Sequence, residues 1–206
     1  MKTITSLRKQ KRNPNRVNVY LDEHFALGLS TIIASQLKIG QLINEDELAE
    51  LHSLDEVESA FQQALGFIDY RPRSIQEVQK KLVKKGHDTT IVNIVLSRLI
   101  EKNFLDDMDF ALRWVESRNA TKPRSKFALQ HELRQKGISD QTIKLVLENI
   151  DDLEMARKAG KLKAHHLSHY EHKLFVKKLS SHLAYRGFGF GIIREVCDEI
   201  WNSIEN

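Results

Sequence analysis

Hydrophobic residues recur along most of the chain with the spacing of amphipathic helices. Three glycines, Gly86, Gly137 and Gly187, stand 51 and 50 residues apart, and each is followed by apolar residues at i, i+3, i+4 and i+7 of one helical face. These positions are Val92, Val95, Leu96 and Leu99; Ile143, Val146, Leu147 and Ile150; and Ile193, Val196, Cys197 and Ile200. The pattern predicts three copies of one helical unit.

A second helix precedes each of these glycines. A leucine lies four residues before the glycine, a basic residue lies directly before it, and a residue suited to cap the next helix comes two residues after it. Because glycine adopts the left-handed conformation that often ends a helix, each glycine should form the corner between two packed helices. The leucines are Leu82, Leu133 and Leu183, and the caps are Asp88, Ser139 and Gly189.

A third helix comes before each pair. Its matching positions are Ala64, Phe67, Ile68 and Arg71 in the first copy, Ala111, Trp114, Val115 and Arg118 in the second, and Ala156 with Ala159 in the last. We therefore predict a mainly α protein of three tandem three-helix bundles, over residues 54–105, 106–153 and 154–206. Bundles this small bury little surface alone, so the copies should pack into an elongated, curved array. The predicted core contains Val78, Leu82, Val95, Leu99, Leu133, Val146, Ile150, Leu183 and Val196.

Residues 1–53 follow a different pattern. The stretch NRVNVYLDEHFALGLS alternates apolar and polar residues on both sides of a turn at residues 22–24, which predicts a β-hairpin. A strand over residues 4–8 would extend the hairpin to a three-stranded sheet. Ser30 should then cap a short helix that ends at Gly40, and Asn44 with Glu47 should start another helix as a capping pair.

Composition and charge narrow the class of protein. The 206 residues are 41% hydrophobic and 29% charged, with only 3 prolines, which suits a globular helical protein. We expect a cytoplasmic protein, because no apolar run approaches a membrane span, the start lacks a signal peptide's apolar segment, and the single cysteine, Cys197, lies at a core position. Residues 1–16 carry six Lys or Arg and no acid, whereas residues 41–70 carry eight Asp or Glu and no Lys or Arg. Two faces of opposite charge favour a mixed partner such as a nucleoprotein.

Positive charge gathers at two helix starts, in RPRSIQEVQKKLVKKG (residues 71–86) and KPRSKFALQHELRQKG (residues 122–137). Ser74 with Glu77 should form a capping box. Cations before a helix start are unfavourable by roughly 0.3–1 kcal/mol each, whereas an anion bound there would be stabilised. A phosphate or a carboxylate of a partner would fit. The candidate partner-binding or phosphate-binding residues are Arg71, Arg73, Lys81, Lys85, Arg118, Lys122, Arg124, Arg134 and Lys136.

The third copy departs from this pattern. Lys173 and Phe175 replace the proline and the serine of the earlier copies, so its basic helix start is weaker. We expect this copy to serve packing or partner contact.

Other candidate chemistry is weaker. His165, His169 and His172 would share a helical face at i, i+4 and i+7, but no HExxH base or neighbouring cysteine accompanies them, so a solvated helix surface is the preferred interpretation over zinc. The GFGFG stretch lies in the corner of the third copy and does not form a nucleotide loop. No GxSxG nucleophile elbow is present, and no Cys/His pair has a sequence context that indicates catalysis. We therefore expect no catalysis, no cofactor and no metal.

The tandem A-x-x-F/W-I/V-x-x-R helix, the PRS helix start and the L-x-x-K/R-G corner together resemble the RecX family, whose members regulate the RecA recombinase. The leading NPNRVNVYLDEHFALGLS hairpin and the segment NFLDDMDFALRWVESR are also similar to that family. The resemblance covers essentially the whole chain. It implies a non-catalytic protein of three helical repeats that lies in the groove of the RecA filament on DNA and limits strand exchange, ATP hydrolysis and the co-protease activity of the SOS response.

Two other functions remain open at this point. Tandem helix-turn-helix-like units would make a DNA-binding protein, although Asn93 and Arg98, then Lys144 and Asn149, offer little for base recognition. Nonspecific contact with single- or double-stranded DNA through phosphates is compatible with the basic residues. A scaffold for an unrelated protein would fit the repeats but not the basic helix starts. We expect a monomer in either case.

Overall fold

The computed structural model describes residues 1–205 of the chain, so the predicted third repeat extends one residue beyond them. Two compact units make up the molecule. The first comprises Met1–Arg73 and Val78–Leu105, and the second comprises Ser74–Glu77 and Asp106–Asn206. No helix among the described residues is long and apolar enough to cross a membrane.

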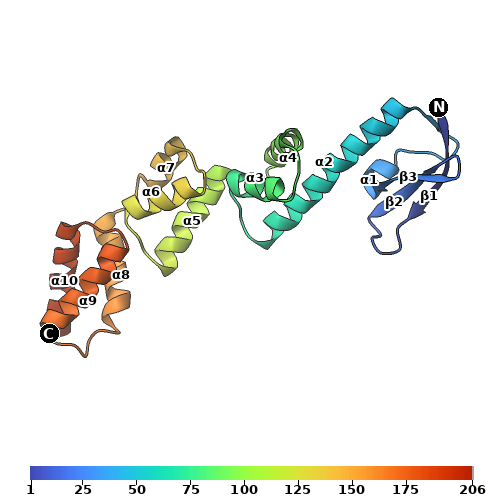
Figure 1. The fold of residues 1–206 in the computed structure, drawn as a ribbon. Helices are drawn as coiled ribbons and strands as arrows, with labels where there is room; N and C mark the ends of the chain where they lie inside the picture. Colours follow the sequence, from blue (N-terminus) through green and yellow to red (C-terminus); the bar gives the residue numbers. More distant parts are fainter. Residues whose placement is uncertain (206) are drawn as a thin grey trace. The chain divides into compact units, whose positions relative to one another are not determined.

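The first unit begins with a small antiparallel sheet (Figure 1). Its strands are β1 (Lys2–Lys9), β2 (Arg16–Leu21), β3 (His24–Ser30) and β4 (Leu42–Ile43), in the order β3-β2-β1-β4. The predicted hairpin is confirmed: Leu21 pairs with His24, and Asp22 and Glu23 take the positive φ values of a tight turn. The sheet has four strands and not three, because β4 pairs with the start of β1.

Alternation of apolar residues builds the core of this sheet. Ile4, Val19 and Leu29 are fully buried, whereas Phe25 remains largely exposed on β3 beside Tyr20. The helix capped by Ser30 forms as predicted, but α1 (Thr31–Ala34) is shorter than expected. It stops well before Gly40, which takes a positive φ in the turn that leads to β4. The chain has to reverse there to pair β4 with β1.

One long helix links the sheet to the first repeat. α2 (Glu45–Tyr70) starts with the predicted capping box of Asn44 and Glu47 and runs without a break through position 53. Its buried Asp55 accepts hydrogen bonds from the Arg16 side chain and the Ser30 backbone N–H, which ties α2 to the sheet. The repeat is completed by α3 (Ile75–Lys84) and α4 (Thr89–Glu101).

The second unit contains two further three-helix repeats. The helices are α5 (Asp107–Thr121), α6 (Lys126–Gln135) and α7 (Asp140–Leu147), then α8 (Asp152–Ala164), α9 (His172–Tyr185) and α10 (Phe190–Glu205). Each triplet surrounds its own hydrophobic core, and α8, α9 and α10 pack side by side in Figure 1. The three predicted repeats are therefore confirmed.

The predicted corners and core positions are also confirmed in detail. Gly86, Gly137 and Gly187 all have φ between +82° and +90°, and Asp88 and Ser139 cap the helices that follow. Of the nine predicted core residues, seven are fully buried, and Val146 and Ile150 are partly buried against the core of the second repeat. Cys197 is buried as predicted.

The histidine-rich stretch is not one continuous helix. α8 ends at Ala164 and α9 begins at His172, so the expected helical face of His165, His169 and His172 does not exist. The residues between the two helices turn back on themselves so that Leu167 can enter the core of the third repeat. No group of three metal-binding side chains occurs among the described residues.

Candidate partner-binding surface

The two PRS helix starts are positions where the second unit is held together. The Ser74 hydroxyl donates to the Lys136 carbonyl oxygen at 2.6 Å, and the Ser125 backbone N–H donates to the Arg186 carbonyl oxygen at 3.2 Å. Each serine also caps its own helix, Ser74 through the predicted box with Glu77. Thus the serine of one copy contacts the basic-glycine corner of the next copy, and two motifs that repeat together along the sequence meet in space.

The glycines of these corners lie against the same segments. A Cβ atom on Gly137 would come within 2.6 Å of the Gln76 Cβ, and one on Gly187 within 2.6 Å of the Ser125 hydroxyl. Gly86 has open space around it. Glycine is therefore required for its backbone conformation at all three corners, and for close approach at two of them.

Carboxylates of the protein itself occupy the helix starts. The first backbone N–H of α3, from Ile75, donates to Asp107 at 2.9 Å, and that of α6, from Lys126, donates to Asp152 at 2.6 Å. Burial raises the pKa of Asp107, an effect that the bond from Ile75 opposes. A carboxylate of the protein itself therefore takes a position at each helix start where the sequence predicted an anion from a partner. Sequence reasoning missed this contact, although each aspartate is the second of an Asp-Asp pair that opens a helix.

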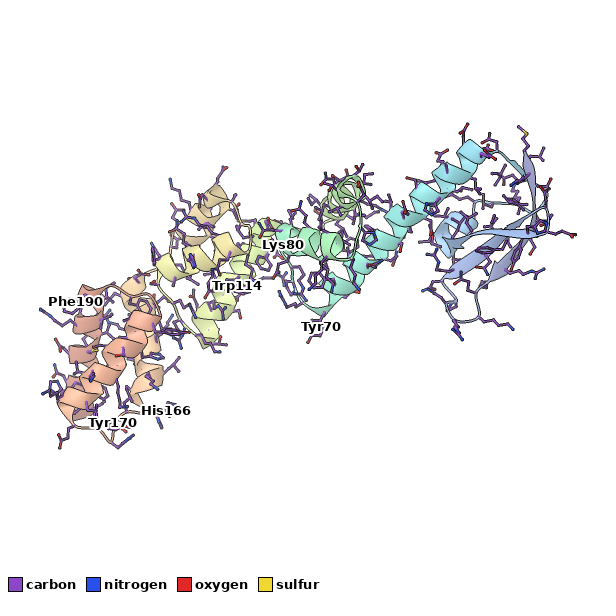
Figure 2. All side chains as sticks on the ribbon, viewed as in Figure 1. Tyr70, Lys80, Trp114, His166, Tyr170 and Phe190 are labelled. Atoms are coloured by element: carbon purple, nitrogen blue, oxygen red, sulfur yellow. The ribbon has the colours of Figure 1, made fainter. Side chains whose placement is uncertain are left out.

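Three candidate residues of the second unit, Arg118, Arg124 and Lys136, lie near Glu132 of α6 or Trp114 of α5, the residue labelled in Figure 2. Glu132 accepts hydrogen bonds from the Trp114 ring nitrogen at 2.7 Å and from Arg118 at 2.8 Å. The Arg124 Nε lies 3.0 Å from the same carboxylate, without the alignment of a hydrogen bond. The guanidinium of Arg118 also stacks 4.6 Å from the Trp114 ring centre.

This cluster carries more positive than negative charge. Burial and the neighbouring Arg124 and Arg118 lower the pKa of Arg186, which donates to the Pro123 carbonyl oxygen and has no ion pair among the described residues. Glu132 is the carboxylate that pairs with both Arg118 and Arg124, so one negative charge faces two positive ones. We name Trp114, Arg118, Arg124, Glu132 and Arg186 the arginine cluster. The sequence marked Arg186 only as the basic residue before Gly187, not as a candidate binding residue, and nothing local marked Glu132.

Lys136 and the remaining candidates of this unit lie nearby or at the surface. Lys136 pairs with Glu77 at 2.7 Å and lies 5.0 Å from the Trp114 ring centre. Arg134 forms an exposed pair with Asp140 on the neighbouring helix. Lys122 is exposed directly after α5 and has no ion pair among the described residues.

Two of the four candidate residues of the first unit lie beside one aromatic ring. Arg73 stacks 3.7 Å from the ring centre of Phe67 and donates to its carbonyl oxygen, and the Lys81 ammonium lies 5.4 Å from the same ring. Arg71 donates to the Pro72 carbonyl oxygen, and Lys85 is exposed at the end of α3. Tyr70, at the end of α2 in Figure 2, is 85% exposed. The structure thus brings five of the nine candidates together around aromatic rings, Arg73 and Lys81 in the first unit and Arg118, Arg124 and Lys136 in the second, and leaves Arg71, Lys85, Lys122 and Arg134 outside these clusters.

The geometry defines a class of protein: a tandem three-helix-repeat protein with a small N-terminal sheet and arginine-aromatic surfaces. Comparison with known proteins gives the family. The family model "Regulatory protein RecX N-terminal domain" matches residues 2–44, "RecX, first three-helix domain" matches residues 60–99, and "RecX, second three-helix domain" matches residues 106–147.

Similar proteins and structures agree with these matches. The chain is 32% identical over 206 residues to "Regulatory protein RecX" of Bacillus subtilis, covering 97% of this chain and 78% of that protein. It is 32% identical over 209 residues to the protein of the same name from Clostridium botulinum strain Eklund 17B, covering 98% of both. The chain belongs to the RecX family.

Solved structures support the fold. A crystal structure of regulatory protein RecX aligns with a TM-score of 0.75 and 23% identity over 96% of this chain and all of that chain. The structure of RecX from Lactobacillus salivarius aligns with a TM-score of 0.60 and 22% identity over 71% of this chain and 97% of that chain.

Proposed function

We propose that this chain is a cytoplasmic, non-catalytic regulator that binds the RecA nucleoprotein filament and limits its recombinase, ATPase and co-protease activities. Family membership supports a regulatory role, because the relatives are named regulatory proteins. The observation that carries the proposal is the excess of positive charge on these surfaces, in the arginine cluster and in the exposed Lys81, Lys85 and Lys122. In this cluster Arg118 and Arg124 share one carboxylate and Arg186 pairs with none among the described residues, which leaves positive charge available for acidic groups on a partner protein or for DNA phosphates.

The helix surfaces give less support to sequence-specific DNA binding. Arg98, the basic residue that α4 could offer for base contacts, pairs at 2.7 Å with Glu58, whose side chain is almost fully buried. An arginine held in this way is not available to read a base edge. Phosphate contact by the remaining cations would add affinity without sequence preference.

The proposal is tested by RecA ATP hydrolysis on single-stranded DNA, titrated with this protein. Lys81, Lys85 and Lys122 are exposed candidates whose loss should leave the fold intact, unlike Arg73 or Arg124, which pack on other groups. We expect wild type to inhibit at amounts below those of RecA, and the triple alanine variant to need about tenfold more protein.

The matched control replaces three other exposed lysines, Lys11, Lys38 and Lys102, with alanine. It removes the same charge and should inhibit like wild type. Equal weakening by both variants would show that only net charge matters. Absence of inhibition by excess wild type would overturn the proposal, and binding of labelled single-stranded DNA without RecA would then favour the DNA-binding alternative.

A further inference from the structure

A second basic region lies along the third repeat and adjoins the arginine cluster at Arg186. Two adjoining hollows, of about 530 and 200 Å³, follow α8 and α9 and share the side chains of Lys163 and His182. The larger one is also lined by Lys177, Lys178 and Tyr185. We call the two together the α8–α9 groove. It lies entirely within the second unit.

The charge of this groove has one sign. Its ionisable lining consists of lysine, histidine, arginine and tyrosine side chains, with no aspartate or glutamate. Lys163, Lys177 and Lys178 have no ion pair among the described residues. By contrast, Lys158 on α8 pairs with Glu154. Burial, Arg186 and Lys163 together lower the pKa of His182, in agreement with a positive local potential.

The floor of the groove is aliphatic. Leu167 is buried there, and Leu174 and Leu162 remain 41% and 58% exposed beside the lysines. The turn between the helices, which carries His166 and Tyr170 in Figure 2, holds Leu167 in place, and the Lys178 ammonium lies 4.8 Å from the Tyr170 ring centre. An ordinary solvent-exposed helix face would carry lysines without large apolar side chains between them. Exposed leucines between unpaired lysines indicate a surface that is covered in use.

We propose that the α8–α9 groove binds an acidic peptide segment that carries a large apolar side chain between its carboxylates. The lysines would pair with the carboxylates, and the apolar side chain would lie on Leu167 and Leu174. A nucleic acid is less well matched, because bases stack on aromatic rings whereas the floor of the groove is aliphatic, and Tyr185 of the lining already faces Arg124. This inference does not depend on which protein the chain regulates.

The test measures fluorescence anisotropy of a labelled peptide, EEDLFEDE, with the full chain. Three competitors are used: QQNLFQNQ without charge, EEDSSEDE without apolar residues, and a twelve-nucleotide oligothymidylate. We expect all three to displace the labelled peptide less well than unlabelled EEDLFEDE does, and the binding of EEDLFEDE to weaken as salt rises. Replacement of Lys163, Lys177 and Lys178 with alanine should weaken binding about tenfold or more.

Two further variants distinguish binding in the α8–α9 groove from attraction by the overall positive charge of the unit. Lys144, Lys161 and Lys173 are exposed in the same unit but line neither hollow, so their triple alanine variant should change affinity less than about twofold. Leu174→Gln keeps every charge and should weaken EEDLFEDE but not EEDSSEDE. Equal loss in both lysine variants, tighter binding of oligothymidylate, or self-association of the chain through these lysines would overturn the proposal.

Discussion

Glu132 is the residue on which the arginine cluster depends. Its side chain is 14% exposed and holds Trp114, Arg118 and Arg124 at once. A carboxylate that serves several donors in a partly buried site contributes more than an exposed pair, because its loss leaves cations without a partner.

We predict that Glu132→Gln lowers the free energy of unfolding by about 1–3 kcal/mol, because the amide can still accept from Trp114 but cannot neutralise the arginines. Urea unfolding measures this. The control is Asp140→Asn, which breaks the exposed pair with Arg134 and should cost less than about 1 kcal/mol. Equal effects of the two variants would contradict the role given to Glu132.

His182 should make stability depend on pH. Its pKa lies below its ordinary value of 6.5, because of burial and of the positive charges of Arg186 and Lys163, while Lys177 and Lys178 line the same hollow. The unfolded chain therefore binds the proton more readily than the folded chain. We predict full stability above pH 6.5 and a decrease as the pH falls from 6.5 through the lowered pKa.

The measurement compares urea midpoints at pH 7.5 and 5.5 for wild type and His182→Gln. The variant should lose less stability than wild type on acidification, since it has no proton to bind at this position. A midpoint difference that is the same in both proteins would assign the pH dependence to other groups.

At the scale of elements, the three glycine corners share one backbone conformation but differ in how closely other atoms pack against them. All three have positive φ, but only Gly137 and Gly187 would place a Cβ within 2.6 Å of another atom. The repeated motif therefore has the same local conformation in each copy, with different surroundings.

We predict that Gly86→Ala costs about 1–2 kcal/mol, the typical penalty for a left-handed residue with a side chain. Gly137→Ala and Gly187→Ala should cost roughly 1–3 kcal/mol more, because the methyl group would displace Gln76 or Ser125. Chemical denaturation of the three variants checks the order. If Gly86→Ala were as damaging as the others, contact at the corners would not be the cause.

The whole molecule contains separate cores. The sheet, the second repeat and the third repeat each bury their own set of apolar residues, and the contacts divide into two units. We therefore expect the two units to unfold in separate transitions.

We predict that Leu82→Ala and Leu183→Ala each destabilise their own unit by about 2–5 kcal/mol, since both side chains are fully buried. Amide hydrogen exchange, measured peptide by peptide, should become faster in α3 and α4 for Leu82→Ala and in α9 and α10 for Leu183→Ala. Uniformly faster exchange along the chain in both variants would contradict separate cores.

The features that sequence alone determined are local. The period of about fifty residues, the apolar helical faces, the hairpin turn and the glycine corners follow from side-chain spacing and allowed backbone angles, which act over a few residues. Capping pairs such as Asn44 with Glu47 belong to the same class. These patterns were enough for the repeats and for most of the core.

Contacts between distant residues were decided only by the tertiary structure. Ser74 meets Lys136, Asp107 meets Ile75, and Glu132 accepts from Trp114 and Arg118 and lies beside Arg124. The same is true of the break between α8 and α9 that sets Leu167 and the lysines around one groove. The reason is physical: a sequence pattern indicates which face of a helix is buried, but the partner of a polar group depends on how whole helices pack, because hydrogen bonds and ion pairs require a particular approach of atoms that are far apart in the chain.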